Sequence, residues 1–202
     1  MKSTEMLCLD EFSLHEIAKV KGSELDFVTG RRMSAMPGRV VSSVGSAVIR
    51  TSAGDLTVFA KPYVSSFEGS ETEYDALSAR VDAVADVDWP RTGNVDFTFS
   101  GEQISDVTVV RDTVTKESFG DEAWTFQTDF GFILKSEHGV VGIFKASYFL
   151  SEIVRIEFAD SQLHFRDPDR SIEWTDSAVL GENFSFNREF IPIDELLKGT
   201  LS

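Results

Sequence analysis

The densest group of side chains that could do chemistry lies late in the chain, over residues 164–171. It combines an imidazole with guanidinium and carboxylate groups around the dipeptide Asp167-Pro168. Such a segment could present a loop whose side chains converge on a small ligand or a cation. The same composition is typical of an Asp-Pro turn between two strands with local ion pairs, and this alternative stays open. The candidate ligand-binding residues of this segment are His164, Arg166, Asp167 and Asp169.

The three histidines do not have the spacing of a metal site. They stand at positions 15, 138 and 164, so no two of them follow the H-x-H or H-x-x-x-H pattern that lets neighbouring imidazoles share an ion. The segment around Asp167 also departs from the calcium-loop pattern, because Ser171 and Ile172 occupy the positions where an Asp or Asn and a glycine are needed. The sequence therefore predicts no metal site.

Sequence motifs of the common enzyme classes are absent as well. The chain has no G-x-S-x-G nucleophile elbow, no phosphate-binding loop and no dinucleotide fingerprint, so we expect no cofactor. An enzyme with dispersed Asp, Glu and His residues, a hydrolase or a sugar-modifying enzyme, is the alternative. It would need a deep pocket that holds two carboxyl groups, or one carboxyl group and His164.

The charge balance excludes one class of partner. The 202 residues include 34 acidic and 19 basic side chains, which gives a net charge of −15. A protein that binds nucleic-acid backbones would need a basic patch, so we do not expect this function. The acidic residues are spread along the chain from Glu5 to Glu195, which favours a role in solubility. An acidic inhibitor or immunity-type partner of a basic protein is a further alternative, and it would require acids clustered on one face.

The single cysteine, Cys8, excludes an intrachain disulfide and lies in a short apolar run. It is expected to be a small buried side chain in a reducing compartment. The N-terminal apolar run is too short and too acidic for a signal peptide, and no window of 18 residues is apolar enough to span a membrane. We therefore expect a soluble, cytoplasmic protein without membrane contact.

Strand patterns dominate the chain after residue 93. Residues 95–100 alternate between apolar and polar types, as in a half-buried strand. Hairpin turns are predicted at 137–139 and 159–161, and in the first half at 51–55. This density of strands and turns indicates a mostly antiparallel sheet structure.

Two late segments concern the candidate site and the partners. His164 is predicted to lie in a strand between Leu163 and Phe165 and to point away from both. Residues 182–187 alternate phenylalanine with polar residues, which predicts either an edge strand or an arm that docks on a second copy of the chain. A homodimer or another protein partner is therefore compatible with the sequence.

One amphipathic helix is predicted over residues 71–87. Its apolar stripe comprises positions 74, 77, 81 and 84, and Ser70 and Glu73 have the spacing of a capping box. Shorter helices are predicted near the termini, over 13–21, where Ser13 and Glu16 repeat the capping-box spacing, and over 193–198.

These elements predict an α+β, mainly β fold: an antiparallel sandwich or half-open barrel with one amphipathic helix and short terminal helices. We expect a single domain over residues 1–202. The alternative divides the chain into a helix-plus-hairpin part, 1–90, and an antiparallel β part, 91–202. The function that we expect first is an acidic binding or interaction protein without catalytic activity, whose ligand the sequence does not identify.

Overall fold

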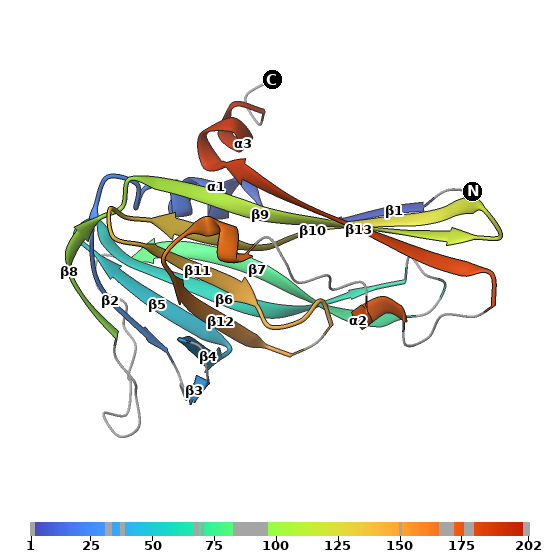
Figure 1. Cartoon of the computed structure of the whole chain (residues 1–202), viewed down its shortest axis with the longest axis horizontal. Helices are drawn as coiled ribbons and strands as arrows, with labels where there is room; N and C mark the ends of the chain where they lie inside the picture. The colour runs from blue at the N-terminus through green and yellow to red at the C-terminus, as the bar shows by residue number, and fades with distance from the viewer. Residues whose placement is uncertain are drawn as a thin grey trace.

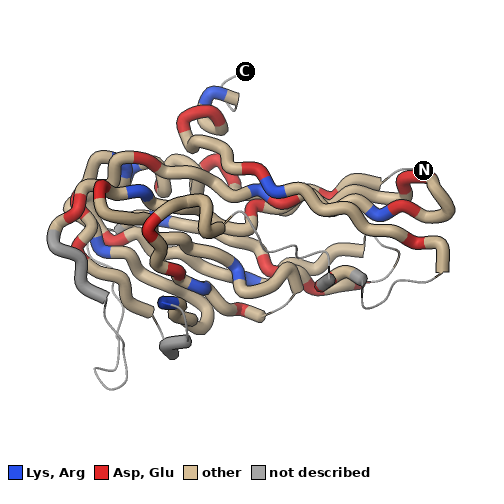
Figure 2. Tube along the Cα trace, viewed as in Figure 1, with Lys and Arg blue, Asp and Glu red and all other residues tan. Residues whose placement is uncertain are grey.

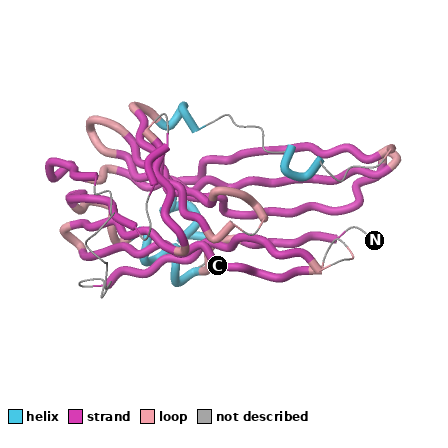
Figure 3. The backbone as a smooth tube through the Cα atoms, turned by 90° about the horizontal axis from the view of Figure 1, so that it is seen from below, coloured by secondary structure: helices cyan, strands magenta, loops and turns pink. Residues whose placement is uncertain are grey.

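The fold is α+β and mainly β, with strands in two packed sheets, as the sequence predicts (Figure 1 and Figure 3). Both sheets combine strands from before and after residue 90. The computed structural model describes residues 3–30, 34–36, 39–66, 69, 71–82, 97–149, 151–165, 172–175 and 180–199.

The large sheet has eight strands in the order β13-β9-β10-β11-β12-β4-β3, with β1 added beside β10. All of its pairs are antiparallel except β1 with β10, which is parallel. Its strands are β1 (Ser3–Leu7), β3 (Ser34–Met36), β4 (Val40–Val44), β9 (Asp106–Ser118), β10 (Asp121–Lys135), β11 (Val140–Lys145), β12 (Ile153–Ala159) and β13 (Glu182–Pro192).

The small sheet is antiparallel and has the order β7-β6-β5-β2-β8. After β2 of this sheet and β3 and β4 of the large one, the chain returns to the small sheet at Gly45, which lies between β4 and β5 and has φ +75°, a conformation that favours glycine. Its strands are β2 (Glu24–Gly30), β5 (Ser46–Thr51), β6 (Gly54–Ser65), β7 (Thr72–Asp82) and β8 (Phe97–Gln103).

Short helices complete the described parts of the chain, and the two terminal ones confirm the prediction. None of the described helices is long and apolar enough to cross a membrane. They are α1 (Glu11–Ala18), the 3-10 helix η1 (Gln162–Phe165), α2 (Ile172–Thr175) and α3 (Ile193–Gly199).

The aliphatic core lies between the two sheets, and an aromatic cluster forms a second packed region. In the first, β-branched and leucine side chains from both sheets meet, and α1 and α3 add Ile17 and Ile193. In the second, Trp174 of α2 contacts rings from both sheets, among them Tyr74 and Phe126 at centroid distances of 6.0 and 5.1 Å. The indole Nε1 of Trp174 is buried without a hydrogen-bond partner in the described parts of the chain.

The predicted helix over 71–87 is wrong for residues 72–82, which form strand β7, and residues 83–87 lie outside the described residues. Leu77, Ala79 and Val81 all contribute to the aliphatic core, so the buried positions repeat every two residues. β7 is paired with β6 along its whole length. These cross-strand contacts outweigh the high helix propensity of its alanines, because tertiary context overrides intrinsic propensity.

The capping-box prediction for Ser13 and Glu16 is also wrong. Asp10 is the N-cap of α1, because its carboxylate accepts the backbone N–H of Ser13 at 2.7 Å. Ser13 and Glu16 instead face the free edge of β7. The Ser13 hydroxyl accepts the N–H of Ala79 at 3.0 Å, and the Glu16 carboxylate accepts the N–H of Val81 at 2.7 Å. Helix α1 therefore covers a sheet edge that would otherwise expose unpaired backbone groups.

A buried polar junction holds the N-terminal segment and the two sheets together. Residues 124–128 of β10 pair with β1, residues 131–135 pair with β11, and the register with β9 shifts between them. In this gap Asp129 accepts the N–H of Leu9 at 2.8 Å and both ends of the Arg111 guanidinium, at 2.7 and 3.1 Å. The carboxylate thus supplies acceptors where the ladder is interrupted.

Lys145 crosses the junction from the end of β11. Its ammonium is fully buried and donates to Thr128 Oγ1 at 2.7 Å and to the carbonyl of Asp75 in β7 at 2.8 Å. Burial lowers the pKa of Lys145 to about 8, and the charges of nearby carboxylates oppose this shift. The ammonium therefore connects the large sheet to the edge strand of the small one.

We predict that Glu16→Ala lowers the free energy of unfolding by about 1–3 kcal/mol, because it leaves the N–H of Val81 without its acceptor. The hydrogen bond with Lys19 holds the pKa of Glu16 below its usual value of 4.5, so this contribution is present at neutral pH and is lost as the pH falls through the lowered pKa. Urea denaturation measures both effects. Glu11→Ala, on the exposed side of the same helix, is the control, and an equal loss there would contradict the edge-capping role.

A second prediction concerns Lys145. Unfolding returns its pKa from about 8 to its usual 10.5, so between these values the unfolded chain binds more protons and the folded state gains stability as the pH rises. Relative to Lys145→Met, wild-type stability should increase over this interval with a slope of up to about 1.4 kcal/mol per pH unit. Denaturation at several pH values measures the slope. Lys135 is an exposed lysine on β10, and Lys135→Met should leave the slope of stability against pH unchanged.

Candidate functional site

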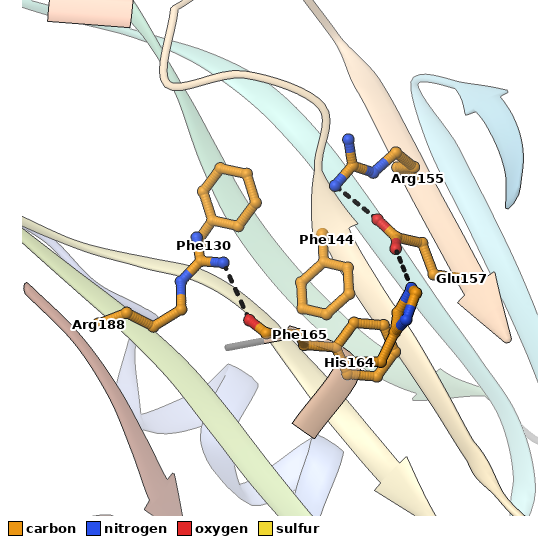
Figure 4. A pocket seen from close by; sticks show the side chains of 7 residues that line it. All are labelled: Phe130, Phe144, Arg155, Glu157, His164, Phe165 and Arg188. Atoms are coloured by element: carbon orange, nitrogen blue, oxygen red, sulfur yellow. Dashed lines mark hydrogen bonds and ion pairs between the residues drawn. The ribbon is translucent and has the colours of Figure 1, made fainter. Parts of the chain in front are cut away.

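A small cavity lies on the face of the large sheet that is turned away from the aliphatic core, beneath η1 (Figure 4). Its volume is about 140 Å³, and three aromatic rings and four polar side chains line it. The lining residues are Phe130, Phe144, Arg155, Glu157, His164, Phe165 and Arg188.

Strand alternation and one β-bulge bring these side chains together. In β12, Val154 and Ile156 point into the aliphatic core, so Arg155 and Glu157 point to the opposite face. In β10, the register shift between Asp129 and Gly131 places the ring of Phe130 in the aromatic cluster, 6.1 Å from that of Phe144.

A glycine on β11 makes room for the aromatic wall. A Cβ atom on Gly142 would come within 2.2 Å of the Phe144 ring and 3.0 Å of the Phe165 ring. The absent side chain lets Phe144 lie against the strand, and Phe165 of η1 packs on it with a centroid distance of 5.1 Å. The walls of the cavity are thus tightly packed at this point.

Three ionisable side chains form a row along one wall of the cavity. The Arg155 guanidinium contacts Glu157 Oε1 at 2.5 Å, and Glu157 Oε2 lies 3.9 Å from Nε2 of His164. Figure 4 shows Glu157 between the two basic groups. The Nε atom of Arg155 is buried and has no hydrogen-bond partner among the described residues. One strong donor at the cavity therefore lacks an acceptor.

Arg188 of β13 is held rigidly on the opposite wall. Its guanidinium forms a bidentate pair with buried Asp112 at 2.7 and 2.6 Å and donates to the carbonyl of Phe165 at 3.3 Å. The hydroxyl of Tyr148 donates to the same carboxylate at 2.9 Å. Burial lowers the pKa of Arg188, but the hydrogen bonds and the charge of Asp112 raise this pKa by more than burial lowers it. The net shift is therefore upward, and the guanidinium stays charged.

Of the four predicted site residues, the structure places one at this cavity. His164 lines it, but the predicted strand is wrong: the residue lies in η1, with Phe165 buried and Leu163 exposed. The chain turns there because Phe165 packs back onto the sheet. Arg166, Asp167 and Asp169 lie outside the described residues.

Sequence reasoning missed Arg155, Glu157 and Arg188. A signal was present for the first two, since both alternate with aliphatic residues in the segment just before the hairpin turn predicted at 159–161, and must share one face if that segment is a strand. Arg188 is two residues from both Phe186 and Phe190, so it shares one face with these two rings in a strand. That these strands and η1 converge on one cavity depends on sheet order, which no local pattern encodes.

Among the described residues, no three His, Cys, Asp or Glu side chains are grouped closely enough to hold a metal ion. The arrangement is instead suited to binding an anion between guanidinium groups, beside apolar rings. A carboxylate–imidazole pair is also the kind of group that transfers protons in general acid–base catalysis.

Comparison with known proteins identifies no relative of this chain: no family model matches it, and neither the curated proteins nor the solved structures include a significant match.

We predict that Tyr148→Phe lowers the free energy of unfolding by about 1.5–3 kcal/mol, because it removes a buried hydrogen bond to a charged carboxylate. The ring contacts of Tyr148 would remain. Chemical denaturation measures the loss, with Tyr63→Phe as the control, since Tyr63 is 42% exposed. Equal stability of the Tyr148 variant and wild type would contradict the role assigned to this hydroxyl.

Proposed function

We propose that the protein is a binding protein without catalytic activity and that its ligand places an anionic group in the cavity beneath η1. The observation that supports this most directly is the buried Nε of Arg155, which has no acceptor among the described residues. A buried donor without a partner costs about 1–3 kcal/mol, and an acceptor oxygen from a ligand would offset this cost.

The cavity also suggests the chemical class of the ligand. At about 140 Å³ it is close in size to an engineered cavity of about 150 Å³ that accepts benzene. Phe130, Phe144 and Phe165 supply apolar contacts, and guanidinium groups match the geometry of carboxylates and phosphates. The proposed ligand is a small apolar group that bears a carboxylate or phosphate, free or at the end of a larger molecule.

An enzyme with a dispersed site is the second candidate, and one observation favours it. His164 and Glu157 lie 3.9 Å apart at the cavity, which is the combination of one carboxyl group and His164 that such an enzyme would need. The small volume of the cavity favours binding of a terminal group over a reaction on a large substrate.

A role as acidic partner of a basic protein has less support. That role would require acids gathered on one face, whereas Figure 2 shows Asp and Glu along most of the elements, with Lys and Arg between them. The net charge of −15 also does not prevent a local anion site, since fields are screened beyond about 8 Å at physiological salt.

Benzoate, with benzyl alcohol as its uncharged counterpart, is the probe that tests the proposal. We expect saturable benzoate binding in NMR titrations, with shifts centred on Phe144 and Phe165, and much weaker binding of benzyl alcohol. Arg155→Met should weaken benzoate binding about tenfold or more, because it removes the charged donor. Arg39→Met, at a guanidinium that is 74% exposed, is the control and should bind benzoate like wild type.

Absence of saturable benzoate binding to wild type, or equal binding by the Arg155 variant, would reject the proposed site. Turnover of a carboxylic or phosphate ester that His164→Ala abolishes would establish the enzyme candidate in its place.

A further inference from the structure

We propose that β13 pairs antiparallel with β13 of a second copy of this chain, about a two-fold axis at Ser185. β13 stands at the end of the large sheet, and within the described parts of the chain its only ladder is with β9. It is 11 residues long, and it lacks an internal lysine or proline of the kind that protects sheet edges, since its proline is the last residue.

The backbone direction of β13 makes alternate residues available for this pairing. The N–H of Phe119 donates to the carbonyl of Gly181 at 2.8 Å, so the backbone of residue 181 faces β9. The register with β9 continues without a bulge from Glu182 to Pro192. By alternation, the N–H and C=O groups of residues 182, 184, 186, 188 and 190 point to the outer edge.

The sequence of this edge is self-complementary. Residues 182–188 read Glu-Asn-Phe-Ser-Phe-Asn-Arg, which is the same in both directions except that its ends carry opposite charges. An antiparallel pair centred on Ser185 places Phe184 opposite Phe186 and Asn183 opposite Asn187 of the second copy. It also places Glu182 opposite Arg188, but within each copy Glu182 is already paired with Lys116 and Arg188 with Asp112. The cross-strand pair of aromatic rings is of a favourable kind.

The register fits the hydrogen-bonding pattern. Residues with even numbers pair with residues with even numbers, so Phe184 and Phe186 of the two copies exchange N–H and C=O groups that face outward. Ser185 meets its own symmetry mate in a non-hydrogen-bonded position, where Cα atoms approach to about 4.5 Å. A two-fold axis there generates an isologous, closed dimer with one continuous sheet.

Apolar surface around the strand supports the same partner. Phe184, Phe186 and Phe190 are only partly buried, although they pack on the aromatic cluster. Leu180, just before the strand, is 95% exposed, and the register places it level with Phe190 of the second copy. Pairing would cover part of this surface, which is the expected driving force for association.

Cysteine cross-linking tests the register directly. Ser185→Cys should give a disulfide-linked dimer under mild oxidation, because the two sulfurs meet at the axis within disulfide geometry. Asn187→Cys, on the same face of the same strand, is the matched control and should not cross-link, because the two copies of residue 187 are four positions apart in this register. The native Cys8 should stay inert, since burial raises the pKa of its thiol to about 11.

Charge variants test the same pairing without a covalent bond. Asn183→Lys combined with Asn187→Lys puts two pairs of like charges across the axis and should weaken the dimer on the order of tenfold in sedimentation experiments. Asn183→Glu combined with Asn187→Lys changes the same exposed positions but places opposite charges together, so the dimer should persist. Circular dichroism checks that both variants fold.

A wild-type chain that sediments as a monomer over a full concentration series would overturn the proposal. Equal cross-linking of the Ser185 and Asn187 variants, or a dimer that is insensitive to the two lysines, would overturn the register. Neither result would affect benzoate binding at the cavity, so the two proposals can fail separately.

Discussion

The polar junction at the interruption in β10 is the interaction on which the other parts of this structure depend. At this point β10 changes partner from β1 to β11, and buried backbone groups of neighbouring segments need partners. Asp129 and Lys145 supply two of them: the carboxylate accepts the N–H of Leu9, and the ammonium donates to the carbonyl of Asp75.

Pairing of opposite charges offsets the free-energy cost of burying this junction in the low-dielectric interior. Two buried carboxylates, Asp129 and Asp112, are each held in a bidentate pair by an arginine, and Lys145 lies among them and Asp75. Pairing and hydrogen bonding offset the cost of burying such charges, whereas removing one partner would leave another uncompensated. The charges of the junction therefore depend on one another.

The same local features also build the candidate site. Asp129 faces the junction, while the neighbouring Phe130 reaches the cavity because of the bulge. In β11, Lys145 faces the junction, and Phe144, one residue earlier, faces the cavity. Two dipeptides thus contribute to both the junction and the cavity, so a change at the junction is expected to alter the aromatic wall of the site.

The edges of the two sheets are treated differently. Helix α1 covers the edge of β7, whereas β13 presents a regular edge to which we assign a second copy of the chain.

The sequence by itself determined the fold class, the strand-rich second half and the short terminal helices, because the alternation of strands and the periodicity of helices are local patterns. It did not determine that residues 72–82 form a strand, since positions 74, 77 and 81 fit a helical stripe and positions 77, 79 and 81 fit the two-residue repeat of a strand. Pairing with β6 decides between them. The sequence singled out His164 as a candidate site residue, but it did not indicate that Arg155, Glu157 and Arg188 lie beside it. The tertiary structure alone decided this strand and this grouping, because contacts such as that between Lys145 and Asp75 join residues 70 positions apart. Such contacts are stabilised by burial and by pairing across the sheets, and the pattern of residues along the chain does not indicate which segments will pair.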